Sequence, residues 1–269
     1  TSVIKMNNAG AGKYNLIAGS GTDTLWGGSS DDIITIAASG QGDADTLDGY
    51  GGTDILQLSA GTHTFTTNDN MIKNIEEVKV DTTSGSTVDL TNQTEGFKIT
   101  VGGQTDSVTG SDGNDIIVIT SAGDGNNDTL IGGSGDDVIN LSAGSHTFSD
   151  DAKLATIETI NANASATTLD LTGQLEGFTI AGGAQGDNLT GGSGNDIITG
   201  GGGDDTLKGG AGNDTLNVDS GSDIITLLGG AGAGGEDDVL VVSNGATATA
   251  ANIINFVATT GTTNAGTAI

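Results

Sequence analysis

The sequence predicts an all-β protein, a parallel solenoid in which short strands stack coil upon coil. Residues 182–226 form a run of consecutive nonapeptides, and a longer unit also recurs, so that Leu58-Ser-Ala-Gly-Thr-His63 returns as Leu141-Ser-Ala-Gly-Ser-His146. The composition combines 48 glycines with no proline and only 3% aromatic residues. So few aromatics argue against a globular core of large side chains. A solenoid needs only a thin core, which regularly spaced Ile, Leu and Val supply.

The nonapeptides predict how each coil is built. Residues 182–226 divide into five of them with the pattern G-G-x-G-x-D-x-U-x, where U is aliphatic, although the fifth has lost its first two glycines. Glycines at positions one, two and four allow positive φ and close backbone approach, which a tight turn requires. The last three residues form a minimal strand whose aliphatic side chain points inward. Two successive nonapeptides make one coil.

Alternate position-six aspartates therefore return to the same side of the solenoid. Asp187, Asp205 and Asp223 stack on one edge, and Asp196 and Asp214 stack on the other. Neighbouring coils lie about 4.8 Å apart, so unneutralised carboxylates in such columns repel one another. Ca²⁺ removes that repulsion, because it takes about six to eight oxygen ligands in flexible geometry. The spacing predicts a column of calcium sites.

Degenerate nonapeptides form two earlier blocks, residues 18–57 and 101–140. Extra residues lengthen one turn in each block, so the interval between aspartates grows equally on both edges and the two-sided stacking is preserved. A last degenerate repeat lies at 233–241. The metal-ligand candidates are Asp23, Asp32, Asp45, Asp54, Asp106, Asp115, Asp128, Asp137, Asp187, Asp196, Asp205, Asp214, Asp223 and Asp238. Weaker or no binding is expected in the turns that lack the position-four glycine, which hold Ser30, Asp43, Gln104, Asn126 and Gln185 there.

A Thr-rich and Ser-rich stretch from Leu58 to about Thr100 follows the first block and predicts larger coils without metal. The whole arrangement then repeats, which indicates an internal triplication. We expect one continuous solenoid of three units: 1–95, 96–178, and 179–269 with the five nonapeptides and a capping tail. Residues 1–17 are weakly patterned and are expected to form an irregular cap. The uncharged stretch 239–269 is expected to be a capping coil or the start of a linker.

Charge and composition exclude several classes of partner. The net charge is −28 and no basic cluster occurs, so nucleic acid and anionic lipid are poor candidates. No apolar run reaches the length of a membrane span. The absence of cysteine suits an extracellular protein stabilised by metal rather than by disulfides. Because residue 1 is Thr and no signal region follows, we expect a processed segment or a protein exported without an N-terminal signal.

Other kinds of site lack the motifs that they require. The residues around Asp128 lack the Gly and Glu of an EF-hand loop. His63 and His146 are equivalent in two repeats and lie outside any H-E-x-x-H motif, so a structural role is expected for both. Glu76 and Glu158 are also equivalent and are expected to be solvated or paired with strand-edge groups. No G-x-S-x-G motif and no cysteine nucleophile occurs, so we expect no enzyme activity.

The nonapeptides resemble those of the RTX (repeats-in-toxin, haemolysin-type calcium-binding) family. The residues that carry the resemblance are 18–35, 40–57, 101–118, 123–140, 182–226 and 233–241. It implies a calcium-binding parallel β-roll, in which Ca²⁺ lies between stacked turns and is held by position-six aspartates and turn carbonyls. It also implies type I secretion by Gram-negative bacteria, with folding in external calcium.

The interleaved segments, with Ile75-Glu76 and Ile157-Glu158, look more like RTX surface-layer proteins and large adhesins. We therefore expect an extracellular, calcium-dependent structural module of a bacterial cell-surface protein that self-associates into a lattice or filament. One alternative is an adhesin or ice-contacting stalk, which requires a flat outward row of Thr or aromatic residues. Another is the secretion and folding tail of an exported hydrolase or toxin, which requires a catalytic domain elsewhere. Cell-surface polysaccharide is left open as a partner.

Overall fold

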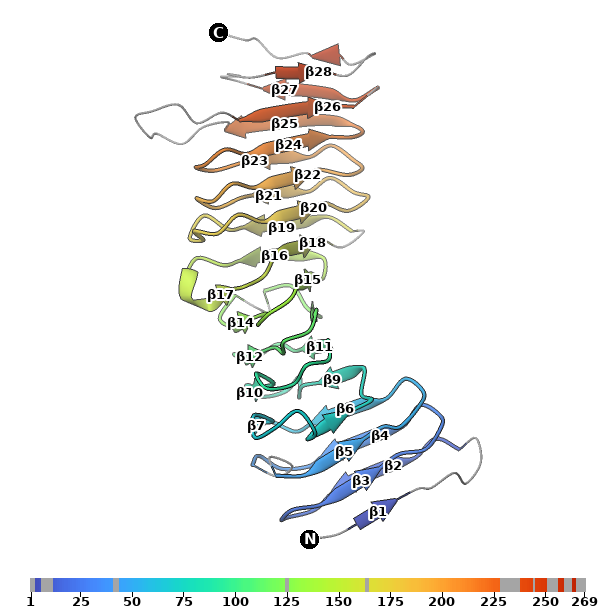
Figure 1. The fold of residues 1–269 in the computed structure, drawn as a ribbon. Coiled ribbons are helices and arrows are strands. Elements are labelled where there is room, and N and C mark those ends of the chain that lie inside the picture. The colour runs from blue at the N-terminus through green and yellow to red at the C-terminus, as the bar shows by residue number, and fades with distance from the viewer. Residues whose placement is uncertain are drawn as a thin grey trace. The chain divides into compact units, whose positions relative to one another are not determined.

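The structure, a computed structural model, describes residues 3–5, 12–40, 44–123, 126–162, 165–227, 238–243, 245–250, 256–258 and 263–264. The chain divides into two compact units, one of residues 1–120 and 127–138 and one of residues 121–126 and 139–269. Within each unit short strands pair in parallel with strands one coil away (Figure 1). The predicted fold class, an all-β parallel solenoid, is confirmed.

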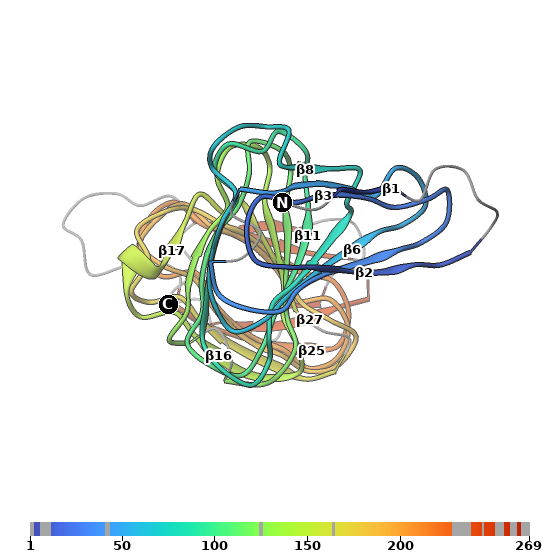
Figure 2. The same ribbon diagram turned by 90° about the horizontal axis from the view of Figure 1, so that it is seen from below.

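The first unit contains three parallel ladders of strands. The first consists of β1 (Val3–Lys5), β3 (Thr24–Trp26), β5 (Thr46–Asp48) and β8 (Ile72–Lys73). The second consists of β2 (Asn15–Ala18), β4 (Ile33–Ile36), β6 (Ile55–Leu58), β9 (Glu77–Lys79), β11 (Lys98–Val101) and β13 (Ile116–Ile119). The third consists of β7 (Gly61–Thr64), β10 (Ser86–Asp89), β12 (Ser107–Thr109) and β14 (Thr129–Ile131). Figure 2 shows β1, β3 and β8 on one side of this unit and β2 and β6 on the other.

The second unit contains two long ladders. One consists of β18 (Thr159–Asn161), β20 (Thr179–Ala181), β22 (Ile197–Thr199), β24 (Thr215–Val218), β26 (Val239–Val242) and β28 (Phe256–Ala258). The other consists of β16 (Gly144–Thr147), β19 (Thr167–Asp170), β21 (Asn188–Thr190), β23 (Thr206–Lys208), β25 (Ser222–Leu227), β27 (Thr247–Ala250) and β29 (Thr263–Asn264). The 3₁₀-helix η1 (Asp151–Lys153) leads into β17 (Leu154–Ala155), and the boundary between the units along the chain falls in β15 (Val138–Asn140).

The thin core follows from the nonapeptide period. The aliphatic residue at the centre of each minimal strand pairs with its counterpart one coil away, as Ile198 does with Ile180 and Leu216. All three side chains are fully buried. Strand residues on either side of the central one point outward, because side chains alternate across a strand. Each coil therefore contributes one or two aliphatic side chains per strand, and no large aromatic core is needed.

Both ends of the chain contain more pairing than the sequence predicted. Residues 1–17 were expected to be irregular, but β1 pairs in register with β3, and β2 pairs in register with β4. At the other end β26 pairs with β28, so the described part of the stretch 239–269 continues the ladder. The expected larger coils after Leu58 are present as β7 to β11.

A buried glutamine side chain donates hydrogen bonds to the backbone of the larger coil in each of the two copies. Gln93 is fully buried, and its Nε2 donates to the carbonyl oxygens of Phe65 and Asn68 at 2.6 and 3.0 Å. Gln174 is its counterpart and donates to the carbonyl of Phe148 at 2.8 Å. These contacts supply donors for carbonyls that lie outside regular strand ladders, where an unpaired polar group destabilises the fold.

The two histidines, for which a structural role was predicted, lie in the interior. His63 and His146 are fully buried within β7 and β16. Each Nε2 lies within hydrogen-bond distance of the carbonyl oxygen four residues earlier, at 2.9 Å from Ser59 and 3.0 Å from Ser142. Neither ring is therefore exposed to solvent.

Candidate functional site

The position-six aspartates stack in columns, as their spacing predicted. All fourteen are at most 3% exposed. In each column the backbone N–H of one aspartate donates to Oδ1 of the aspartate in the next coil, at 2.6 to 2.9 Å. The columns are Asp23–Asp45, Asp32–Asp54, Asp106–Asp128, Asp115–Asp137, Asp187–Asp205–Asp223 and Asp196–Asp214–Asp238. Their assignment as metal ligands stays a prediction.

Five of these columns begin one coil earlier than the nonapeptide pattern indicated. The backbone N–H groups of Tyr14, Phe97 and Phe178 donate to Oδ1 of the first aspartate in their columns, at 2.6 to 2.7 Å. Ser86 and Thr167 do the same in two other columns at 2.8 and 2.7 Å. These residues occupy the place of position six without a carboxylate. The sequence signal was present, since an inward aliphatic residue follows each of the three aromatic residues by two positions.

The hydrogen bonding of the second carboxylate oxygen, Oδ2, differs between the first aspartate of a column and the later ones. Oδ2 of Asp32 accepts the N–H of Gly28 at 2.5 Å, and Oδ2 of Asp187 accepts the N–H of Gly183 at 2.7 Å. Asp115 and Asp196 are bonded in the same way by position-two N–H groups. Both oxygens of these carboxylates therefore already have backbone donors.

In contrast, Oδ2 of Asp54, Asp205 and Asp223 is buried and has no hydrogen-bond partner in the described part of the chain. At Asp54 and Asp205 the backbone at position two of the same nonapeptide also differs from that of the first aspartates. Tyr50 and Gly201 have φ of 74° and 90°, the left-handed region. The N–H of Tyr50 donates instead to Asp48 Oδ1 at 3.0 Å.

Burial makes these carboxylates costly when charged. It is the largest cause that raises the pKa of Asp54 and of Asp223 to about 6, and neighbouring carboxylates raise it further. Burial also raises the pKa of Asp205. No basic side chain pairs with any of the three within the described residues. A buried carboxylate that has no counter-ion and one oxygen without a donor is stabilised by a cation from solution or by a proton.

The position-one glycines leave oxygen-lined space beside the carboxylates. A Cβ at Gly191 would overlap both Oδ2 of Asp196 and the carbonyl oxygen of Gly209 in the next coil. A Cβ at Gly200 would overlap Oδ2 of Asp205. Carboxylate and carbonyl oxygens are the ligands that Ca²⁺ prefers, so the residues present fit this ion.

Main-chain oxygens are necessary to such a site. Among the residues that the structure describes, no three His, Cys, Asp or Glu side chains gather as a metal-binding group. An ion in a column would therefore have at most two stacked carboxylates, and turn carbonyls would supply the other protein ligands. No helix in the described ranges has the length and apolar character of a membrane span.

Comparison with protein families gives a direct match. The family described as RTX calcium-binding nonapeptide repeat (4 copies) matches residues 15–35, 38–62, 98–118, 120–145, 179–207, 190–225 and 199–234. A comparison with curated proteins finds no match. The matched segments cover more than half of the chain and contain all the aspartate columns up to Asp223. The protein therefore belongs to the RTX calcium-binding nonapeptide repeat family, and calcium is the ion that its repeats bind.

Proposed function

We propose that this calcium-binding module folds in extracellular calcium and serves as a self-associating structural part of a secreted bacterial cell-surface protein. The RTX β-roll is a structural calcium-binding fold, so the proposal needs no catalytic group. The observation that carries it is the buried, unpaired Oδ2 of Asp54, Asp205 and Asp223 in the part of the chain that the structure describes. Folding buries these charges, and the described residues supply no basic side chain and no donor for Oδ2, so calcium binding is coupled to folding.

The coupling provides a switch between two compartments. Extracellular calcium modules have Kd values of about 10⁻⁴ to 10⁻³ M. At cytosolic calcium the repulsion within the columns and the entropy of 48 glycines oppose folding. In millimolar calcium the energy of ion binding is added to the stability of the folded state. This difference suits export of an unfolded chain that folds outside the cell.

Circular dichroism tests the switch. We expect an unfolded or loosely collapsed chain in EGTA and a β-rich chain in millimolar Ca²⁺. Mg²⁺ should substitute poorly, because it demands tight octahedral geometry. A spectrum that is the same in EGTA and in Ca²⁺ would refute coupled folding.

Calcium should also reduce the repulsion between copies. Ions at the seven stacked pairs predicted from the three blocks carry fourteen positive charges, half of the net charge of −28. Outward aliphatic residues are then available for contacts between copies, among them Ile17, Ile116, Ile197 and Ile224, which are 39% to 61% exposed. A triplicated unit, with divisions at 1–95, 96–178 and 179–269, would repeat such contact surfaces along a lattice or filament.

One observation favours a second candidate, an adhesive stalk. Thr62, Thr87, Ser107 and Thr129 form an outward row of hydroxyls along the ladder from β7 to β14. The corresponding row of the second unit is interrupted by Asn188 and Ile224, so the regular surface is short. Light scattering and electron microscopy in increasing Ca²⁺ distinguish the two. Assembly supports the lattice or filament, whereas a folded chain that stays monomeric at high concentration favours the stalk or a secretion tail.

A further inference from the structure

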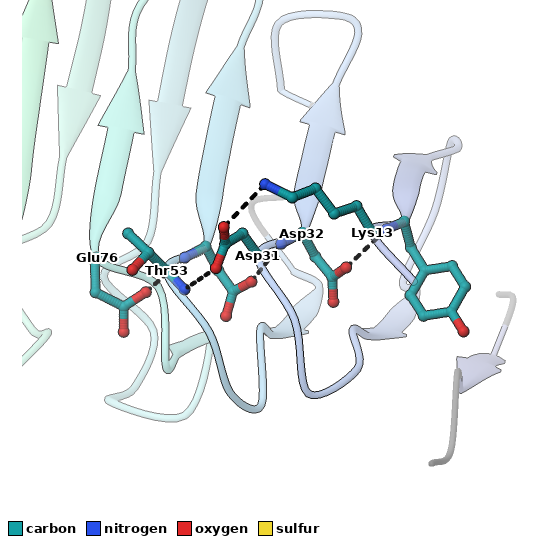
Figure 3. A network of polar contacts seen from close by, with 7 residues as sticks. Lys13, Asp31, Asp32, Thr53 and Glu76 are labelled. Carbon is teal, nitrogen blue, oxygen red and sulfur yellow. Dashed lines mark hydrogen bonds and ion pairs between the residues drawn. The ribbon is translucent and has the colours of Figure 1, made fainter. Parts of the chain in front are cut away.

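Glu76 continues an aspartate column into a coil that has no nonapeptide. The interval from Asp54 to Glu76 equals the interval from Asp32 to Asp54. The N–H of Asp54 donates to Oε2 of Glu76 at 2.6 Å, just as the N–H of Asp32 donates to Oδ1 of Asp54 at 2.6 Å. Figure 3 shows Glu76 at the end of this row of polar contacts, beyond Thr53. A carboxylate therefore stands where a further position-six aspartate would be.

The space next to this carboxylate resembles the oxygen-lined spaces beside Gly191 and Gly200, which we call cradles. Asp54 is fully buried, and its Oδ2 has no hydrogen-bond partner in the described ranges. A Cβ at Gly49 would overlap that Oδ2 and, on the other side, the carbonyl oxygen of Asn74. The absent Cβ thus leaves a gap lined by a carboxylate oxygen and a carbonyl oxygen from the next coil.

The backbone at Asn74 holds its carbonyl oxygen in this position. Asn74 has φ of 49°, a left-handed conformation that is uncommon outside glycine. Its side-chain Nδ2 donates to Oδ1 of Asp48 at 2.7 Å, which supports the conformation. Thr156, the counterpart of Asn74 in the second copy of the sequence motif, has φ of 51°. A β-branched residue seldom adopts this region, so its recurrence indicates that the turn geometry is required.

We propose that Asp54, Glu76 and the main-chain carbonyl oxygen of Asn74 form an additional calcium site at the junction between the first nonapeptide block and the larger coil. The inference rests on calcium binding by the repeats, and it extends binding into the stretch from Leu58 to Thr100, where no metal was expected. Neither carboxylate has a basic partner within the described residues. Glu76 is exposed, so water completes the ligand shell on its side.

The test compares isosteric variants of the full chain. Glu76→Gln keeps an oxygen that accepts the N–H of Asp54 and removes the charge. Glu77→Gln is the matched control, because this substitution makes the same change in net charge. The carboxylate of Glu77 pairs with Lys98 and Lys79 and not with the aspartate column. Native mass spectrometry in saturating Ca²⁺ should find one ion fewer in Glu76→Gln than in the wild type and no loss in Glu77→Gln. Asp54→Asn should lose two ions, since Asp54 serves this site and the one shared with Asp32.

Luminescence of Tb³⁺ gives a second readout of the same site. The chain contains one tryptophan and two tyrosines, and all three lie in or beside the first block (Tyr14, Trp26 and Tyr50). Tb³⁺ emission excited through these side chains therefore reports on that block. Emission should fall in Glu76→Gln and be unchanged in Glu77→Gln. Wild-type stoichiometry in Glu76→Gln, or a single ion lost in Asp54→Asn, would overturn this site and leave calcium-dependent folding intact. A wild-type chain that binds no calcium would overturn both.

Discussion

Asp205 is the position at which one substitution should remove two calcium ions. It lies in the middle of its column, where its Oδ1 accepts the N–H of Asp187 and its own N–H donates to Asp223. Its buried Oδ2 has no partner in the part of the chain that the structure describes. Asp205→Asn retains an acceptor for the N–H of Asp187 but removes the charge. Because stacked pairs share this carboxylate, the pair with Asp187 and the pair with Asp223 should both lose affinity.

The size of the effect follows from ligand-linked stability. At free calcium about one hundred times Kd, each bound ion stabilises the folded state by about 2.7 kcal/mol. Asp205→Asn should therefore lower the calcium-dependent stability by about 5 kcal/mol, and Asp223→Asn, at the end of the column, by about half as much. The loss should disappear at low calcium, where removal of a buried charge favours the folded chain.

Unfolding midpoints measured across a calcium titration provide the assay. The dependence of the unfolding free energy on the logarithm of free calcium reports the number of ions bound. It should fall by two ions in Asp205→Asn and by one in Asp223→Asn. Asp204→Asn is the control, since this neighbouring residue is exposed and bonds the N–H of Ser222. Equal effects of the substitutions at 205 and 223, or an equally large effect at 204, would refute shared coordination in the column.

Two further predictions test the cradle and the buried charges. Gly200→Ala should destabilise the calcium-bound chain by about 1–3 kcal/mol in a denaturation experiment, because the added Cβ overlaps Oδ2 of Asp205. Gly202→Ala is the control and should change stability much less, because the nearest neighbour of its Cβ lies at 3.3 Å. Similar losses in both variants would contradict an enclosed cradle. Acidification should favour the folded state of the calcium-free chain, because burial raises the pKa of Asp54 and Asp223 to about 6 from the usual value of 3.8. Their destabilising charge is fully present above the folded pKa and is relieved as pH falls through it. Circular dichroism should therefore show a gain of β structure between about pH 7 and pH 5. An unchanged spectrum would argue against destabilisation by these buried charges.

The period of the sequence was enough to predict the fold and the stacking of the aspartates. Parallel coils repeat the same strand pairing, so a constant interval along the chain places equivalent positions next to each other. For this reason Asp187, Asp205 and Asp223 could be assigned to one column from their spacing alone. The same argument holds for the inward aliphatic residues, because a minimal strand has only one side chain facing the core.

Departures from the repeat explain why the sequence did not predict the additional coils at the ends of the columns. Tyr14, Phe97 and Phe178 continue the coil without a carboxylate at position six, and their hydrogen bonds with the following aspartates are made by the backbone. A search for Asp at fixed spacing passes over them, since a backbone donor has no side-chain signature. Glu76 was seen in the sequence, but an extended turn separates it from the pattern, and its alignment with Asp54 depends on how that turn folds.

Only the tertiary structure shows which carboxylate oxygens have no hydrogen-bond donor. Asp187 and Asp205 occupy the same position of similar nonapeptides, and both nonapeptides have glycine at position two. Gly183 directs its N–H to Oδ2 of Asp187, whereas Gly201, one coil later, has φ of 90° and leaves Oδ2 of Asp205 without such a bond. Glycine allows both conformations at similar energy, so contacts between neighbouring coils select between them. The sequence by itself determined where the acidic columns run, and coil stacking determined which of their oxygens accept a backbone hydrogen bond.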